Sequence, residues 1–162
     1  MFREMRRKNQ VLSSEECIQV LNRATSGVLA VSGDDDYPYA VPLSYIYNNN
    51  KIYFHGAKTG HKLDGIMRNE KVSFCVIDQD EIVQEEYTSY FRSVIAFGKA
   101  RIMEGEEKKR ALEILTARYS PDIEEMERSK AVDKGLMGVC MIELEIEHMS
   151  GKEAAGLKKA KQ

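Results

Sequence analysis

The chain has 162 residues, of which 43% are hydrophobic and 31% charged, and its formal net charge is −2. This length fits one globular domain with its own core, and the balanced charge excludes the broad basic face that nucleic-acid binding requires. No apolar run approaches the roughly 20 residues of a membrane helix, and the charged N-terminus lacks the apolar core of a signal peptide, so we expect a cytoplasmic protein without nucleic-acid or membrane partners.

The first predicted elements are a helix over residues 13–25 and a strand over residues 27–32. Ser13 and Glu16 have the spacing of a capping box, in which each side chain satisfies a backbone N–H group at the start of a helix. Apolar residues then recur at helical spacing. A glycine, three aspartates and a proline follow the strand and predict a turn over 33–36.

The next segment, residues 39–47, is rich in β-forming residues and contains Pro42. Proline lacks the N–H group that a central strand donates, so this strand is expected at an edge, at a bulge or beside a ligand. Three asparagines at 48–50 predict a turn, because asparagine tolerates left-handed backbone angles. The run KIYFH over 51–55 predicts the return strand, so the two strands together predict a β-hairpin.

A glycine-containing loop over 56–62 and a short helix over 63–69 are expected next. Two β-prone segments follow, over 71–80 and 87–103. Gly98 predicts a bulge or bend within the second of them.

Two helices are expected before the last strand. The first covers 104–119. The second has Ser120 as its N-cap and Pro121 as its first helical residue, and it runs to about Lys134. In the last strand, over 138–149, isoleucine and leucine alternate with three glutamates, which predicts one buried face and one solvated face.

These elements amount to about six strands and four helices, joined mainly by hairpins and without recurring βαβ units. The predicted fold class is therefore mainly β (α+β), an antiparallel barrel with peripheral helices. We expect a single domain over residues 1–150 and a polar C-terminal tail over residues 151–162.

The segment with the clearest chemical potential is FHGAKTGHK, which ends a strand and begins a helix. The helix is expected to begin near Thr59 or Gly60, and helix N-termini present unpaired N–H groups that suit a phosphate. Gly60 lets the backbone approach a ligand, Thr59 supplies a hydroxyl group, and Lys62 supplies a positive charge. The alternative is an ordinary connection with solvated lysines, because the loop matches neither a Walker A motif nor a dinucleotide-binding fingerprint.

No metal centre is expected, because the three cysteines and three histidines lack the spacing of metal-binding motifs. Five acidic residues between positions 78 and 86 are typical of a solvated loop. Arg6 and Arg7 lie in a basic N-terminal segment, and Lys152 follows the last strand. The roles of these three residues stay open.

The order of the segments resembles the flavin-binding split β-barrel family of pyridoxamine 5′-phosphate oxidase-like proteins, and within it the nitroimidazole-resistance (Nim) branch. The resemblance covers essentially the whole chain. It is carried above all by PYAVPLSY and FHGAKTGHK, which fall in the order and spacing of the family.

The resemblance implies an FMN site at the interface of a homodimer. One set of residues would meet the isoalloxazine ring, a second would hold the ribityl chain and phosphate, and a third would reach the flavin of the other subunit. The sets are, in order, Val41, Pro42, Leu43 and Ser44; His55, Gly56, Ala57, Gly60, His61 and Lys62, with Thr59 beside them; and Arg92 and Ser93.

A homodimer is also expected because the apolar strand face that includes Val41, Leu43 and Ile52 or Phe54 would otherwise lie uncovered. The chain contains no tryptophan, and the Trp- and Arg-containing C-terminal segment of the oxidase has no counterpart here. The resemblance therefore does not extend to the oxidation of vitamin B6.

The resemblance implies instead an FMN-dependent oxidoreductase that reduces a small-molecule electron acceptor such as a nitroimidazole, with NAD(P)H as the candidate electron donor. His55 matches a histidine near the flavin in the Nim branch and is the candidate catalytic residue. The alternative for His55 is a strand-end histidine that bonds the backbone. Two other functions stay open: a non-catalytic flavin-binding or storage module, and a split barrel that binds haem or a deazaflavin.

Overall fold

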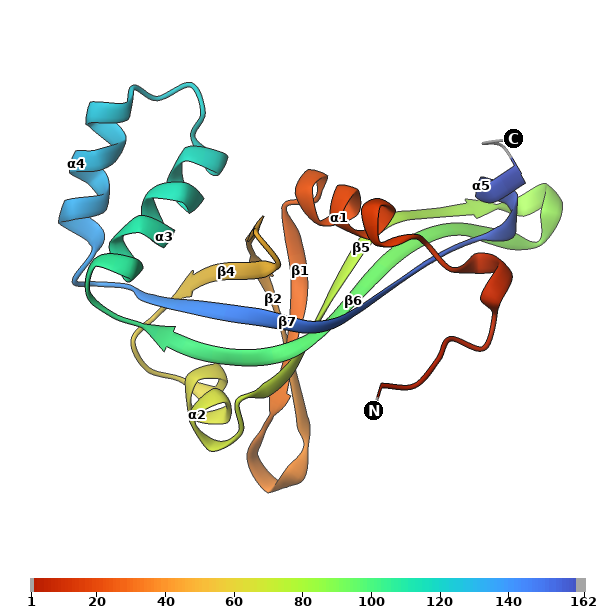
Figure 1. Ribbon diagram of the computed structural model, residues 1–162, viewed down its shortest axis with the longest axis horizontal. Helices are drawn as coiled ribbons and strands as arrows, with labels where there is room; N and C mark the ends of the chain where they lie inside the picture. Colours follow the sequence, from red (N-terminus) through yellow and green to blue (C-terminus); the bar gives the residue numbers. More distant parts are fainter. Residues whose placement is uncertain (1, 160–162) are drawn as a thin grey trace.

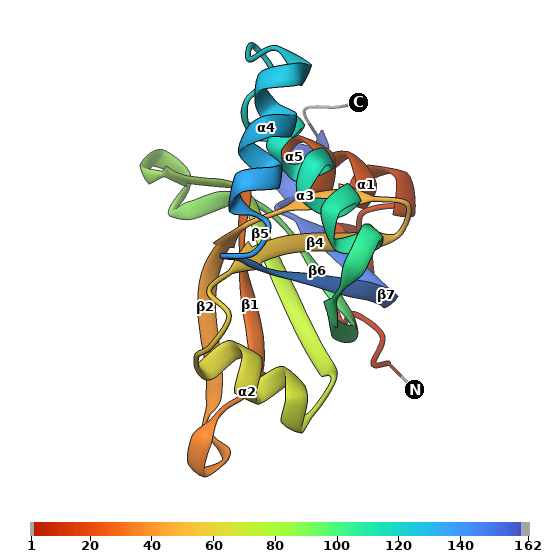
Figure 2. The same cartoon turned by 90° about the vertical axis from the view of Figure 1, so that its left-hand side faces the viewer.

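The computed structural model describes residues 2–159, which form one seven-stranded antiparallel sheet (Figure 1, Figure 2). The strands lie in the order β2-β1-β5-β6-β7-β4-β3, and the sheet is not closed by pairing between its two edges. The strands are β1 Ser26–Ser32, β2 Pro38–Ser44, β3 Ile46–Asn48, β4 Lys51–Gly56, β5 Lys71–Val83, β6 Thr88–Met103 and β7 Cys140–Glu153.

Helices surround this sheet, so the predicted fold class, mainly β with an antiparallel split barrel and peripheral helices, is confirmed. No helix within residues 2–159 is both long and apolar enough to cross a membrane. The helices are α1 Ser14–Arg23, α2 His61–Arg68, α3 Gly105–Tyr119, α4 Glu125–Gly135 and α5 Ala155–Lys159, and the 3₁₀ turns are η1 Lys8–Gln10, η2 Asp34–Asp36 and η3 Gln84–Glu86.

Helix α1 begins with the expected capping box. The Glu16 N–H group donates to Ser13 Oγ at 3.2 Å, and the Ser13 N–H group donates to Glu16 Oε2 at 2.8 Å. Cys17, Val20 and Leu21 form the buried face of the helix. The first turn is thereby fixed by local bonds, and the apolar face holds α1 against the sheet.

The segment expected as one strand over 39–47 is broken at Tyr45 into β2 and β3, which corrects the prediction. β2 pairs with β1, whereas β3 pairs with β4, so the two pieces lie at opposite edges of the sheet. The edge position expected for Pro42 is confirmed, and the expected hairpin is confirmed for β3 and β4 alone. Its turn contains Asn49 and Asn50, both with positive φ.

Buried contacts hold the bend at Tyr45, which is 1% exposed. Its hydroxyl group donates to the Leu21 carbonyl of α1 at 2.7 Å, and its N–H group donates to the Tyr119 hydroxyl of α3 at 2.9 Å. The chain therefore crosses from one edge of the sheet to the other inside protein, where its polar groups find partners.

The main core fills the barrel. Ile52, Phe54 and Phe74 are completely buried, and Val41 and Leu43 pack against the same cluster. The prediction that Ile52 or Phe54 lies on an uncovered face with Val41 and Leu43 is therefore wrong. Alternation along β2 and β4 turns these side chains inward, and the face left open is the opposite one.

Strand β6 bends at Gly98, as expected, where its pairing with β7 shifts register between Phe97 and Gly98. A Cβ atom at Gly98 would lie 1.9 Å from the carbonyl oxygen of Glu145. Only glycine allows this close approach of two backbones.

Helices α3 and α4 form a hairpin over one end of the sheet (Figure 1). They enclose a second, smaller core, which includes Leu112 and Leu115 of α3, Val132 of α4, and Met103 and Met141 of the sheet. This end of the outer sheet face is therefore covered by the chain itself.

Glu143 lies under that cover and is 3% exposed, which corrects the expectation that all three glutamates of the last strand are solvated. Its carboxylate accepts bonds from Lys51 Nζ at 3.1 Å and from Arg101 Nε at 2.9 Å. A buried carboxylate requires such partners, because it has lost its water. Glu145 and Glu147 are exposed, as expected.

Helix α4 begins at Glu125 and not at Ser120, which corrects the predicted start of this helix. Ser120 ends α3: its N–H group donates to the Thr116 carbonyl at 2.9 Å, and its ψ of 58° is not helical. A residue that precedes proline is disfavoured in the α-helical region, so Pro121 stops α3 before a new helix can form.

Strand β7 passes residue 150, the expected domain boundary, and continues to Glu153, after which α5 follows. Arg92, Ser93 and Val94 of β6 pair with residues 151–153. Residues 151–153, expected in the C-terminal tail, therefore belong to the sheet.

A row of ion pairs joins this end of β6 and β7 to β5 and α1. Asp78 lies where the β5–β6 register shifts, and its carboxylate accepts from Arg23 Nη2 at 2.6 Å and from Arg92 Nη1 at 3.0 Å. Arg92 Nε also donates to Glu153 Oε2 at 3.0 Å, and the Glu153 side chain is 0% exposed. Burial raises the pKa of Asp78, but the bonds from Arg23 and Arg92 outweigh it and hold the pKa below its ordinary value.

Replacing Asp78 with Asn is expected to lower the free energy of unfolding at pH 7 by about 2–3 kcal/mol, because Arg23 loses its carboxylate partner and Arg92 keeps only that of Glu153. The ionised Asp78 adds to the free energy of unfolding above its unfolded-state pKa of about 3.9. This stabilisation is lost as the pH falls through the lower pKa that Asp78 has in the folded protein. Urea unfolding from pH 7 down to pH 3 should therefore show the gap between native and Asp78→Asn proteins narrowing below about pH 4. A gap that stays constant over this range would contradict the ion-pair explanation.

Candidate functional site

The loop between β4 and α2 forms a cradle from Gly56, Gly60 and Lys62. Gly60 precedes α2 with φ 130° and ψ 170°, a conformation that favours glycine, and no side chain caps the helix. Nothing lies within 4 Å of where a Cβ atom of Gly60 would be. The first N–H groups of α2 lack carbonyl partners within the helix, so they can meet a ligand here.

Lys62 lies against the backbone of Gly56. A Cβ atom at Gly56 would lie 2.7 Å from Lys62 Cε and 2.8 Å from Lys62 Nζ. The absence of a side chain at Gly56 is what admits the ammonium group to the end of β4. The structure thus brings three of the predicted residues, Gly56, Gly60 and Lys62, into one positively charged cradle.

His61 anchors the start of α2. Its ring stacks on Tyr39 with 4.1 Å between centroids, and its Nε2 accepts from the Asp34 N–H group at 3.2 Å. Arg68 Nη2 donates to the Asp34 carboxylate at 2.9 Å, and this bond lowers the pKa of Asp34. No sequence motif marks Tyr39, Asp34 and Arg68, which meet only in the fold.

His55 lies on the other face of β4. It is exposed, and it pairs with Met141 of the second core, whereas the neighbouring Gly56 pairs with Cys140 of the main core. Side chains alternate along a strand. The structure therefore does not bring His55 together with Lys62, while Ala57 and Thr59 are exposed in the loop beside it.

The predicted ring-binding strand is β2. Val41 and Leu43 are half-buried against the main core, and Pro42 and Ser44 are exposed on the outer face. Because β2 is an edge strand, backbone groups along its free side are open to a ligand.

Arg92 and Ser93 lie far along β6 from the cradle. They pair with Glu153 and Lys152, whereas the other end of β6 pairs with Met141, next to the β7 residue that faces Gly56. Within one chain the structure thus does not join Arg92 and Ser93 to the cradle, and the Arg92 guanidinium group bonds two carboxylates.

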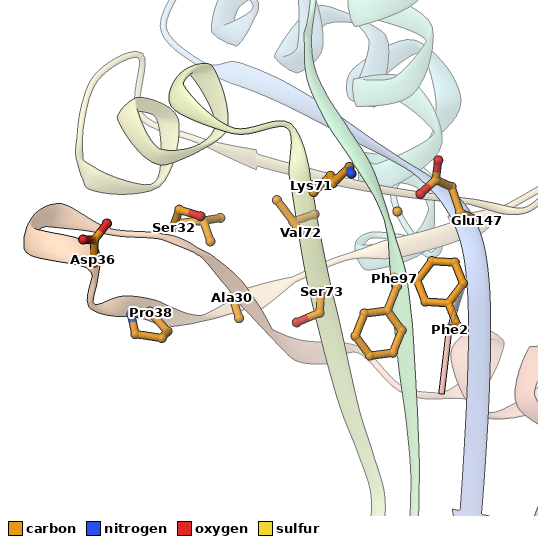
Figure 3. A pocket seen from close by; sticks show the side chains of 12 residues that line it. Phe2, Ala30, Ser32, Asp36, Pro38, Lys71, Val72, Ser73, Phe97 and Glu147 are labelled. Carbon is orange, nitrogen blue, oxygen red and sulfur yellow. The ribbon is translucent and has the colours of Figure 1, made fainter. Parts of the chain in front are cut away.

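A hollow of about 550 Å³ opens on the outer face of β1, β5 and β6. Figure 3 shows Phe2 and Phe97 on one side of it and Ala30 and Pro38 on the other, with Ser73 between. The Phe2 ring also stacks on His148, with 4.6 Å between centroids. The sequence analysis missed this hollow, because it is formed by residues from strands that are far apart in the chain.

The described residues contain no group of three or more His, Cys, Asp or Glu side chains arranged to hold a metal ion. The thiols are also poor nucleophiles. Burial, with Glu16 nearby, raises the pKa of Cys17 to about 11, and burial likewise raises the pKa of Cys75 and of Cys140.

Comparison with known proteins gives one family match and one curated relative. The model for the family "Pyridoxamine 5′-phosphate oxidase" matches residues 13–153. An uncharacterized protein of Rhizobium meliloti (strain 1021) is 31% identical over 90 residues, which are 56% of this chain and 54% of the relative. The chain thus spans about half the length of the curated relative that it matches.

Several solved structures share the fold. A conserved hypothetical protein of Mycobacterium tuberculosis has a TM-score of 0.80 at 22% identity and covers 96% of this chain and 93% of its own. A candidate 5-nitroimidazole antibiotic resistance protein of Bacteroides thetaiotaomicron VPI-5482 has a TM-score of 0.72 at 23% identity. The match covers 88% of this chain and 86% of that protein. A FAD-binding protein of Mesorhizobium loti has a TM-score of 0.61 at 26% identity, and the match covers 90% of this chain and 98% of that protein.

Proposed function

This chain belongs to the pyridoxamine 5′-phosphate oxidase family, and on that premise we propose that it is a flavoprotein that binds FMN beside β2 and the start of α2. The family resemblance seen in the sequence is confirmed. The observation that carries the proposal is the cradle itself, in which Lys62 reaches the end of β4 only because Gly56 has no side chain.

The cradle fits a phosphate in both shape and charge. Gly60 leaves open space above its backbone, the first N–H groups of α2 point out of the helix, and Lys62 supplies a cation. His61, held between Tyr39 and Asp34, fixes the position of that helix end. The phosphate would therefore be bound by pre-positioned groups, at little further cost in ordering.

The ring of the flavin would lie along the free edge of β2. The half-buried Val41 and Leu43 fix the strand to the core, and Pro42 removes one N–H group from its backbone. A bound flavin would supply the redox chemistry by accepting and passing on electrons. The chain would bind it, orient it and limit the access of solvent.

We propose that the protein acts as a homodimer through its outer sheet face. Ile77 is 65% exposed and Ile95 is 37% exposed on this face, and Cys75 and Phe97 flank them by strand register. Exposed apolar surface of this kind, continuous with the 550 Å³ hollow, is typical of an interface. A second copy would cover it and would bring Ser93 of one chain toward the flavin of the other.

We further propose that the protein is an oxidoreductase that reduces small molecules such as nitroimidazoles, with NAD(P)H as the electron donor. The support is the likeness in fold to the candidate 5-nitroimidazole resistance protein. A non-catalytic flavin-binding or storage module is the second candidate. A split barrel that binds haem or a deazaflavin is the third, and an absorption spectrum of the purified protein separates it from the other two.

Replacing Lys62 with Ala is expected to weaken FMN binding ten- to a hundredfold, because a charge-assisted bond is worth about 1.5–3 kcal/mol. Riboflavin lacks the phosphate, so its affinity should hardly change. Calorimetric titration of both ligands into native and Lys62→Ala proteins provides the measurement. Equal losses for FMN and riboflavin would mean that Lys62 has a structural role only.

Replacing Ile95 with Asp is expected to convert the dimer into a monomer, because a charge would be buried at the centre of the interface. Ile114→Asp is the matched control, because Ile114 is exposed to a similar extent, 39%, but lies on α3 and not on the strands of the proposed interface. Sedimentation velocity over a dilution series measures the oligomeric state. A dimeric Ile95→Asp protein would mean that the interface is wrongly placed. A monomer that binds FMN with undiminished affinity would mean that the partner chain contributes nothing to the flavin site.

FMN-loaded protein is expected to consume NADH or NADPH continuously when a nitroimidazole is present, because each turnover restores the oxidised flavin. The measurement is the decrease in nicotinamide absorbance together with the loss of the nitro compound. A single stoichiometric reduction without turnover would favour the storage module over the enzyme.

A further inference from the structure

A second hollow, of about 330 Å³, opens beside the cradle. It lies between the loop after β4, the end of β6, the start of α3 and the start of β7. Its lining includes Lys58, Met103, Glu104, Lys108 and Cys140. Its volume is at the lower end of the roughly 300–1,000 Å³ typical of small-molecule pockets, so it can hold one half of a dinucleotide.

This hollow adjoins the cradle at Cys140. Gly56 and Cys140 are direct partners in the β4–β7 pairing, so their side-chain positions lie on one face of the sheet. Lys62 Nζ occupies that position at Gly56, and Cys140 lines the hollow. Burial raises the pKa of the Cys140 thiol, while Lys108 and Lys62 both act to lower it, as expected of two ammonium groups near one thiol.

The lining of the hollow contains two lysines and one acidic residue. Some lysines of the described chain form ion pairs, for example Lys51 with Glu143 and Lys109 with Asp133. No such pair within residues 2–159 involves Lys58, Lys62 or Lys108. Glu104 is the one acidic residue in the lining. Lys58 and Lys108 therefore line the hollow with one carboxylate, that of Glu104, and Lys62 lies next to it near Cys140.

We propose that Lys58 and Lys108 bind a second phosphate, that of an adenylate group, next to the cradle. This inference rests on the proposed function, because the first phosphate occupies the cradle at Lys62. FMN has a single phosphate, for which the proposed function already assigns Lys62 and the N–H groups of α2. The two further lysines and the adjoining hollow match the adenylate half of a ligand with two linked phosphates.

Two ligands carry this adenylate group: FAD as the bound cofactor and NAD(P)H as the electron donor. The chemistry that Lys58 and Lys108 recognise is the same in both. The test therefore uses AMP for the subsite itself, with adenosine as the ligand that lacks the phosphate, and then compares the two dinucleotides.

The experiment is calorimetric titration of the full chain in the native, Lys108→Ala and Lys130→Ala forms. Lys130 is an exposed lysine of α4, so its replacement removes the same charge away from the hollow. Lys108→Ala is expected to weaken AMP binding about tenfold or more, while adenosine binding and the Lys130→Ala protein stay unchanged. Matching thermal unfolding curves show that both variants are folded.

Titrations with FAD and with the nicotinamide dinucleotide then show which of the two ligands places its adenylate group in the hollow. If FAD is the source, Lys108→Ala weakens FAD about tenfold and leaves FMN unchanged. If NAD(P)H is the source, the FMN-loaded protein loses affinity for the oxidised dinucleotide instead. AMP binding that Lys108→Ala does not change would overturn the proposal. Normal AMP binding without any flavin binding would overturn the proposed function and keep the subsite, so the two failures are distinguishable.

Discussion

The buried bend at Tyr45 connects the two edges of the sheet, and the barrel depends on it. β2 and β3 would form one strand if the backbone stayed extended, but β2 pairs with β1 and β3 with β4. A crossing of this kind leaves backbone groups unpaired inside the protein, which is costly. Leu21 of α1 and Tyr119 of α3 provide the partners for Tyr45. Two helices from distant parts of the chain thus make an open sheet behave as a barrel.

The candidate site follows from this bend. β2 is one edge strand of the sheet, and β4 pairs with β3, the other edge strand. The loop after β4 therefore returns alongside β2 and places α2 against it. The stacking of His61 on Tyr39 and the Arg68–Asp34 bond hold that contact. The cradle is therefore built on two fixed elements, β4 and α2, which favours a pre-organised phosphate site over an adaptable one.

The two faces of the sheet differ in how they are covered. The inner face is filled by the main core, and one end of the outer face is covered by α3 and α4, where Glu143 is buried between two cations. The rest of the outer face keeps exposed apolar residues such as Ile77 and Ile95. At the far end, Asp78, Arg92 and Glu153 join β5, β6 and β7 by ion pairs, and Arg23 connects α1 to the same group.

Local signals in the sequence determined much of this protein. The capping box of Ser13 and Glu16, the asparagine turn, the edge position of Pro42 and the bulge at Gly98 each depend on neighbouring residues or on one backbone constraint, and each was predictable. The glycines and Lys62 of the cradle were predictable for the same reason. The break at Tyr45, the burial of Glu143 and the placing of Lys58 and Lys108 around one hollow were decided by the tertiary structure alone. Each depends on residues far apart in the chain, for which the sequence has no period or spacing.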